Sequence, residues 1–187
     1  MSHSDLVPSE WVTRWAHLVH AGGKVLDLAS GHGRHARFFA ARGYEVTACD
    51  VDPNALASLA GLPGISTLQA DLENGSPWPF QAGMFDAVVV CNYLHRPLFA
   101  NIADALAPGG VLVYETFLAG NERHGKPSNP RFLLGRDELL SAFAGRLVVT
   151  GFEQGLVEHG KPALIQRICA VRSEALDHKL RDHKLEP

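Results

Sequence analysis

The feature that constrains the fold most is an alternation of short apolar runs with helical stretches. Five strand-like runs, "KVLDLA", "YEVTACD", "ISTLQAD", "FDAVVVCN" and "VLVYETF", follow one another, with helix-like segments between most of them. This order predicts a parallel sheet wrapped by helices. Two later runs, "RLVVTGFEQG" and "PALIQRICAVR", are joined by a loop short enough for an antiparallel pair. We therefore expect an α/β fold, a doubly wound seven-stranded sheet that is mostly parallel with a C-terminal antiparallel hairpin.

Three connections have a composition of their own. The stretch "ENGSPWPFQAG" is too rich in proline and glycine for a regular helix, so the third helix is expected to be degenerate. A turn is expected at "APGG", before the fifth strand. Near the start, "VPSEWVTRWAHLV" predicts a helix capped by Ser9. Its tryptophans have the spacing of a core face, although a ligand contact by Trp11 or Arg14 stays open. The expected division is a capping helix at 1–23, one domain at 24–172 and a polar tail at 173–187.

Composition narrows the class of protein. The 187 residues are 46% hydrophobic and 20% charged, which is ordinary for a globular domain. A net charge of -3 argues against a broad nucleic-acid-binding face, since such domains are usually basic. No run of about 18 apolar residues predicts a membrane span. The opening lacks the apolar core of a signal peptide, and the three cysteines have no CxxC spacing, which favours reduced, buried thiols in a cytoplasmic protein.

The stretch "GHGRHA" satisfies the dinucleotide-binding pattern G-x-G-x-x-G/A. Glycines at a strand end allow a ligand to approach the N–H groups at a helix N-terminus. Asp50 follows about 20 residues later, at the end of the second strand, where it can bond a ribose hydroxyl. These features serve NAD and S-adenosylmethionine equally well, and His35 and Ala36 are expected to be ordinary residues of the first helical turn.

Three further features favour S-adenosylmethionine. Asp27 lies inside the first strand, where a negative charge suits a sulfonium and an ammonium better than a pyrophosphate. Asp71 follows the third strand at the same edge of the sheet, within reach of an adenine amino group. The last two strands also look like an antiparallel hairpin rather than a continued parallel series.

The motifs occur in the order of a known superfamily. "VLDLASGHG", "VTACDVDP", "QADLE", "FDAVVVCNYL" and "LAPGGVLVYETF" resemble the five successive motifs of class I S-adenosylmethionine-dependent methyltransferases, which have a Rossmann-like fold. The likeness extends from about residue 24 to residue 171. Among the branches, "GHGRHARFFAARGYEVTACDVDP" is similar to small methyltransferases of the tellurite-resistance type.

The resemblance implies S-adenosyl-L-methionine as cofactor and assigns contacts to eight residues. These are Gly31 and Gly33 at the amino-acid portion and ribose, Asp50 at the ribose hydroxyls, Val51 at the adenine face, Asp71 and Leu72 at the adenine edge, Asn92 beside the methyl group, and Asp27 toward the ammonium group.

Catalytic candidates follow the fourth and fifth strands. His95 is a candidate base, with a helix cap or backbone contact as the alternative. Tyr93 either lines the pocket, contacts the sulfonium with its ring, or packs. Glu115 either binds substrate or forms a salt bridge to Arg96 or to a lid residue. Neither an Asn-Pro-Pro-Tyr motif nor a Pro-Cys pair is present, so methylation of nucleobases by those routes is disfavoured.

The segment 119–136 is long and has little periodicity. Loops of this length are uncommon unless they are functional or disordered. It carries four basic residues against Glu122, in a chain that is otherwise acidic. We expect a lid that favours an anionic or polar small substrate, with Arg96, Arg123 and Lys126 as substrate contacts. A solvated insertion is the alternative.

The expected function is S-adenosylmethionine-dependent methyl transfer to a small molecule. The alternatives are an NAD-dependent oxidoreductase and a non-catalytic S-adenosylmethionine-binding partner subunit. No metal site, membrane partner or nucleic-acid partner is expected. The acceptor atom and the oligomeric state stay open.

Overall fold

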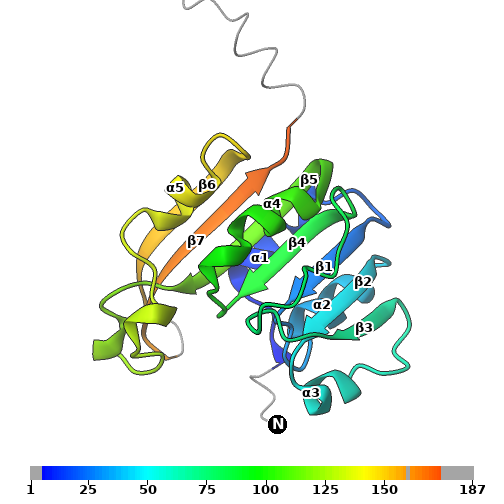
Figure 1. Ribbon diagram of the computed structural model, residues 1–187, viewed down its shortest axis with the longest axis horizontal. Helices are drawn as coiled ribbons and strands as arrows, with labels where there is room; N and C mark the ends of the chain where they lie inside the picture. Colours follow the sequence, from blue (N-terminus) through cyan, green and yellow to red (C-terminus); the bar gives the residue numbers. More distant parts are fainter. Residues whose placement is uncertain (1–5, 159–160, 174–187) are drawn as a thin grey trace, which may run out of the picture.

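The chain folds around one seven-stranded sheet, seen in a computed structural model that describes residues 6–158 and 161–173 (Figure 1). The strands lie in the order β3-β2-β1-β4-β5-β7-β6. Their bounds are β1 Lys24–Leu28, β2 Glu45–Asp50, β3 Ile65–Gln69, β4 Phe85–Cys91, β5 Leu106–Phe117, β6 Val148–Val157 and β7 Ala163–Val171. The first five strands are mutually parallel, and β7 runs antiparallel to both β5 and β6. The predicted fold class is confirmed.

Helices cover both faces of this sheet. On one face lie α1 Glu10–Trp15, the 3-10 helix η2 Ala16–Leu18, α2 Arg34–Ala40 and α3 Pro53–Ala57. On the other lie the 3-10 helix η3 Arg96–Leu98, α4 Phe99–Ala105 and α5 Glu138–Phe143 (Figure 1). A core forms on each face because alternate residues of a strand point to opposite sides. Val88 and Val90 of β4 belong to the cluster beneath α4 and α5, and Val89 belongs to the cluster beneath α1 and α2.

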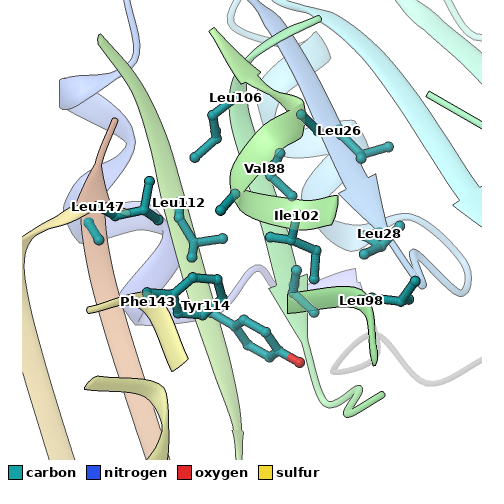
Figure 2. Packing of buried hydrophobic residues seen from close by; sticks show 14 of the residues in the cluster. Leu26, Leu28, Val88, Leu98, Ile102, Leu106, Leu112, Tyr114, Phe143 and Leu147 are labelled. Carbon is teal, nitrogen blue, oxygen red and sulfur yellow. The ribbon is translucent and has the colours of Figure 1, made fainter. Parts of the chain in front are cut away.

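The cluster beneath α4 is dense in aliphatic and aromatic side chains. Ile102 of α4 and Phe143 of α5 lie over Leu112 and Tyr114 of β5 (Figure 2). The Tyr114 hydroxyl donates to the Tyr93 carbonyl oxygen at 2.9 Å, so this core reaches the chain that leaves β4. The packing therefore fixes the backbone beside the predicted site.

Helix α1 is part of the second core. The Ser9 hydroxyl oxygen caps it by accepting the Trp11 N–H at 3.1 Å, as predicted. The Trp11 ring is 1% exposed, and its Nε1–H donates to the Ile168 carbonyl oxygen at 3.1 Å. Arg14 instead pairs with Glu153 at 2.7 Å. The core interpretation of this helix is confirmed, whereas its division from the domain stays a prediction.

Two connections show how sequence signals are resolved. Residues 70–84 contain no helix, so the degenerate third helix is confirmed. The turn expected at 107–110 lies inside β5, because Leu106 already pairs with Phe85 of β4 and the register shifts before Val111 pairs with Ala87. Gly109 N–H also donates to the Arg172 carbonyl oxygen, and Arg172 N–H to that of Gly110. These two bonds, at 2.6 and 2.8 Å, extend the β5–β7 ladder past the turn. The expected start of the fifth strand at Val111 was therefore wrong by five residues.

The segment 119–136 has more structure than its composition indicates. It contains the 3-10 helices η4 Asn121–Arg123 and η5 Pro130–Phe132. Its second half is joined to the end of β5, since Leu134 N–H donates to the Phe117 carbonyl oxygen at 2.8 Å. Ala119 N–H in turn donates to the Leu134 carbonyl oxygen at 2.9 Å. The segment is thus anchored beside the carboxyl edge of the sheet.

Two remaining expectations concern the ends and the membrane. The polar tail predicted at 173–187 lies almost wholly outside the described residues. None of the described helices has both the length and the apolar character needed to cross a bilayer.

Candidate functional site

Three adjacent cavities lie at the carboxyl edge of the parallel strands, where ligands of open α/β sheets bind. The glycine pocket, about 390 Å³, is lined by residues 29–32, 34–35 and 91–93. The acid pocket, about 460 Å³, is lined by residues 29, 50–51, 70–73 and 93. The segment pocket, about 430 Å³, is lined by residues 73, 94–97, 129 and 131–132. Ala29 and Tyr93 line both of the first two pockets, so these form one groove.

The turn after β1 is built on unusual backbone angles. Gly31 has φ +52° and Gly33 has φ +72°. Two non-glycine residues, Ala29 at φ 55° and Asn92 at φ 58°, also adopt the left-handed region beside the glycine pocket. Such backbone costs about 1–3 kcal/mol per residue and clusters at functional sites. The concentration of strain here is consistent with a ligand site.

The two glycines of the motif have different surroundings. Gly31 lines the glycine pocket, and a Cβ there would meet no atom within 4 Å. A Cβ on Gly33 would lie 2.5 Å from both Cδ atoms of Leu59, which is fully buried. Gly33 is not among the residues that line the pocket, so the structure explains it by packing between α2 and the residues after α3.

Asp27 lies beneath the turn rather than at the pocket wall. Its side chain is buried, and Oδ2 accepts the Ala36 N–H in the first turn of α2 at 2.9 Å. This carboxylate therefore already occupies a donor that a pyrophosphate would need. Asp27 therefore disfavours a pyrophosphate, as predicted from the sequence. Its side chain, however, points to the helix and not toward the pocket.

His35 was expected to be an ordinary helix residue, and that expectation was wrong. It is 3% exposed and lines the glycine pocket. Its Nδ1 lies 3.7 Å from Asp27 Oδ1, and its Nε2 accepts the Ser9 N–H at 3.2 Å. His35 thereby connects the cap of α1 to the buried acid of β1. Its partner Ser9 is 26 residues away, so the local sequence held no signal for this contact.

Glu115 is taken up by the same network. Its carboxylate accepts the Ser9 hydroxyl at 2.9 Å and faces Arg167 at 3.3 Å. A salt bridge was considered for it, but with Arg96 or a lid residue, and the partner is instead on β7. Glu115 lies two residues before the end of β5 and is the register partner of Cys91 on the neighbouring strand β4. The structure thus gives this residue a role in holding α1 to the sheet.

Several polar groups of the glycine pocket were missed by the sequence analysis. Ser30 Oγ and His32 Nδ1 are buried and have no hydrogen-bond partner within the described part of the chain. Buried polar atoms without partners are rare in native proteins, and a bound ligand is one way to satisfy them. Arg34 also lines this pocket, beside the Cys91 thiol. Burial, followed by the charge of Glu115, raises the pKa of that thiol, and Arg34 opposes the rise.

The acid pocket contains the second-strand acid as predicted. Asp50 Oδ2 accepts the Gly31 N–H at 2.7 Å, and Oδ1 accepts the Asp52 N–H at 2.9 Å. Each carboxylate oxygen can accept a second bond, so the group can still receive ribose hydroxyls. Val51 beside it is 57% exposed, an apolar surface that a base ring can cover.

The far wall of the acid pocket comes from the chain after β3. Asp71 is exposed, and one of its oxygens accepts the Glu73 N–H at 2.9 Å. Leu72 is half-buried against the core. Tyr93 stands between the two pockets, and burial together with the Glu73 carboxylate raises the pKa of its phenol. Asn92 lines the glycine pocket, with its N–H bonded to the Glu115 carbonyl oxygen at 2.9 Å.

His95 and Arg96 begin the segment pocket. His95 Nδ1 lies 3.8 Å from Glu73 Oε2, and its side chain is three-quarters buried. The Arg96 guanidinium donates to both oxygens of Glu138 at 2.6 and 3.0 Å. It also donates to the carbonyl oxygens of Arg131 and Leu133. Arg96 therefore fastens the 119–136 segment, whereas it had been expected to contact substrate.

The other two expected substrate contacts lie elsewhere. Arg123 and Lys126 are exposed and line none of the three pockets. Arg131, Phe132 and Asn129 of the same segment line the segment pocket instead. The signal for a charged segment was sound, but its composition could not tell which cations face the cavity.

Comparison with solved structures identifies the fold. It is shared with TehB from Haemophilus influenzae at a TM-score of 0.70 and 20% identity, over 92% of this chain and 63% of that one. The fold is also that of the Burkholderia thailandensis 1,6-didemethyltoxoflavin-N1-methyltransferase, solved with 1,6-didemethyltoxoflavin and S-adenosylhomocysteine bound. There the TM-score is 0.64 at 19% identity, over 88% of this chain and 76% of that one.

The sequence itself carries the family match. Residues 25–110 match the family model described as "Methyltransferase domain", a stretch that runs from β1 into β5. The chain is 30% identical over 129 residues to "Putative methyltransferase YqeM" of Bacillus subtilis (strain 168), covering 62% of this chain. It spans 50% of that relative's length.

Residues 25–110 are thus similar to a methyltransferase domain, and the chain has the fold of solved S-adenosylmethionine-dependent methyltransferases, as expected. The likeness to TehB concerns the fold, so the tellurite-resistance branch stays a prediction.

Proposed function

We propose that the protein transfers a methyl group from S-adenosylmethionine to a small-molecule acceptor. The observation that carries the proposal is the groove formed by the glycine and acid pockets. It combines an acid bonded to the glycine turn, an exposed apolar side chain and buried polar atoms that have no partner among the described residues. These are the groups that a ribose, a base and an amino-acid portion require.

The two pockets of the groove bind different parts of the cofactor. In the acid pocket, Asp50 binds the ribose hydroxyls, Val51 packs on the adenine face, and Asp71 and Leu72 hold the adenine edge. In the glycine pocket, Gly31 leaves room for the amino-acid portion, and Ser30 supplies an unpartnered hydroxyl. Tyr93 lines both ends and Asn92 lines the glycine pocket beside it, and the methyl group lies next to these two residues.

The bound cofactor supplies an electrophilic methyl group: the acceptor's lone pair forms the new bond to carbon, and the sulfur–methyl bond breaks with its electron pair retained by sulfur. The chain contributes mainly by holding the acceptor in line and excluding water. Where the acceptor carries a proton, His95 is placed to accept it, with Glu73 at 3.8 Å to stabilise the imidazolium.

Asp27 makes S-adenosylmethionine the better candidate over NAD. Its carboxylate occupies the α2 N–H that a pyrophosphate would approach, and it places negative charge beneath the turn. The three thiols are free and buried, which fits a reducing compartment, so we place the protein in the cytoplasm.

Calorimetric titration with S-adenosylhomocysteine tests the cofactor site. Asp50→Asn keeps the shape of the side chain and removes its charge, and we expect it to weaken binding at least about tenfold. Asp52→Asn is the matched control, because Asp52 caps α3 outside the groove and asparagine caps equally well. Equal affinities of the two variants would reject the groove as the cofactor site.

Turnover is tested separately by release of S-adenosylhomocysteine in a screen of small acceptors. Asp50→Asn serves as the inactive control. Binding of NAD in place of S-adenosylhomocysteine would contradict the proposal, and cofactor binding with no released product for any acceptor would favour the non-catalytic subunit.

A further inference from the structure

The segment pocket presents a cation and an aromatic ring that the proposed cofactor groove does not use. Arg131 is exposed, and among residues 6–158 and 161–173 its guanidinium takes part in no ion pair or hydrogen bond. Phe132 is 46% exposed, unusual for a ring of its size. Both side chains line a cavity of about 430 Å³, within the size range of small-molecule sites.

These two residues are held by a built element. Asn129 caps η5 by accepting the Arg131 N–H on its side-chain oxygen at 3.0 Å. Leu133 and Leu134 directly after it are 5% and 0% exposed. Arg96 donates to the carbonyl oxygens on both sides of Phe132. The backbone that carries Arg131 and Phe132 is therefore fixed from the core side, and only their side chains face the cavity.

The same cavity is also lined by an acidic residue. Glu73 and His95 line it with their side-chain atoms 3.8 Å apart, and Pro97 adds an apolar surface. Arg96 also lines the cavity, but its charge is paired with Glu138. The cavity is thus lined by the Arg131 guanidinium, which is unpaired within the described part of the chain, and by a carboxylate–imidazole pair. An anionic group is favoured next to Arg131 and disfavoured next to Glu73.

The Glu73–His95 pair is also the part of the segment pocket that adjoins the cofactor groove. Glu73 lines both the acid pocket and the segment pocket. His95 follows two residues after Tyr93, which lines both ends of the groove. A ligand in the segment pocket therefore directs its neutral end toward the groove and its anionic end away from it.

We infer that the segment pocket is the acceptor site and that its acceptor is a planar small molecule with an anionic group at one end. The anion binds Arg131, the plane packs on Phe132, and the hydroxyl or amino group that receives the methyl lies at His95 and Glu73. A guanidinium matches a carboxylate through two parallel hydrogen bonds, and an aromatic ring favours a flat partner. This inference rests on the proposed function.

Binding of paired probes tests the inference without turnover. The protein is saturated with S-adenosylhomocysteine, and saturation-transfer NMR measures the affinities of benzoate, 4-hydroxybenzoate, indole-3-carboxylate and naphthalene-2-carboxylate, each against its neutral carboxamide. We expect carboxylates to bind about tenfold more tightly than their amides, and Arg131→Gln to abolish that preference. Arg123→Gln is the matched control, since Arg123 is exposed in the same segment but lines no pocket described here.

A second variant addresses the plane of the ligand. Phe132→Ala is expected to weaken naphthalene-2-carboxylate more than benzoate, because the larger ring loses more contact. Circular dichroism melting checks that every variant is folded.

Each outcome separates the two proposals. If no carboxylate binds better than its amide, or if Arg123→Gln has the effect of Arg131→Gln, the acceptor-site inference is overturned while cofactor binding still supports the methyltransferase. If the carboxylates bind through Arg131 but S-adenosylhomocysteine does not bind, the anion site stands and the proposed function fails.

Discussion

Replacing each glycine of the motif by alanine is expected to separate packing from ligand binding. Gly33→Ala forces a left-handed φ of +72° on a residue with a Cβ, which costs about 1–2 kcal/mol. The new methyl would also lie 2.5 Å from both Leu59 Cδ atoms. Leu59 is fully buried within its cluster and has little room to move, so overpacking adds about 1–3 kcal/mol. The expected loss in the free energy of unfolding is therefore about 2–5 kcal/mol.

Gly31→Ala is the matched variant. Its φ of +52° carries a similar backbone cost of about 1–2 kcal/mol, but nothing lies within 4 Å of the added Cβ. The open space belongs to the glycine pocket, so the methyl occupies room that the cofactor needs. We expect Gly31→Ala to unfold at a higher urea concentration than Gly33→Ala and yet to bind S-adenosylhomocysteine at least about tenfold more weakly than the wild type.

A double-mutant cycle isolates the contact with Leu59. Leu59→Ala alone leaves a cavity and costs about 2–5 kcal/mol. In the double variant the cavity accepts the new methyl. We therefore expect the double variant to lose at least about 1 kcal/mol less free energy of unfolding than the sum of the losses of the two single variants. Urea unfolding at pH 7 measures all four proteins. If Gly33→Ala is no less stable than Gly31→Ala, or if the cycle is additive, the packing explanation of Gly33 is wrong.

Three further predictions concern stability and reactivity. Burial opposes ionisation of Glu138, but hydrogen bonds from Arg96 and from the Gly135 N–H lower its pKa. The contribution of Glu138 to the free energy of unfolding is therefore present above about pH 4.3, and it is lost as the pH falls through the lower pKa of the folded state. Glu138→Gln should therefore cost about 1 kcal/mol or less at pH 7, because the pair is partly exposed, and less at pH 3 than at pH 7; a constant difference in urea unfolding would contradict this. Burial raises the pKa of Cys49 and of Cys169 to about 12, and a disulfide reagent at pH 8 should label none of the cysteines in the native protein and all three in urea; fast labelling of the folded chain would refute their burial. Trp11→Ala should destabilise the fold by about 3–5 kcal/mol, measured in the same way, and a loss below about 1 kcal/mol would show that α1 is not part of the core.

The sheet could be predicted because its signals are local. The run "FDAVVVCN" is apolar from Ala87 to Cys91, and β4 is buried on both faces over these residues. Ser9 marked a helix start at the residue where the structure caps α1. The strand boundary that was furthest off, at the start of β5, depends on the pairing of Leu106 with Phe85 of β4, more than twenty residues away in the chain.

The candidate site could be predicted only as far as strand ends determine it. Gly31, Asp50 and Asp71 follow the carboxyl ends of parallel strands, and residues at those ends meet at one edge. Side-chain direction is different, because it depends on neighbours from distant segments. Glu115 accepts a hydrogen bond from Ser9, which is 106 residues away in the chain, and Arg96 donates to Glu138, which is 42 residues away.

The sequence alone determined that strands and helices alternate, that a glycine turn and two acids gather at one edge, and that a charged segment lies near them. Repeating patterns and strand ends suffice for this, since each is written within a few consecutive residues. Only the tertiary structure decided that Asp27 caps α2, that Arg96 fastens the segment, and that Arg131 and Phe132 face the cavity. The physical reason is that a charged side chain takes the partner that packing brings within hydrogen-bond distance, and packing joins residues that the chain keeps far apart.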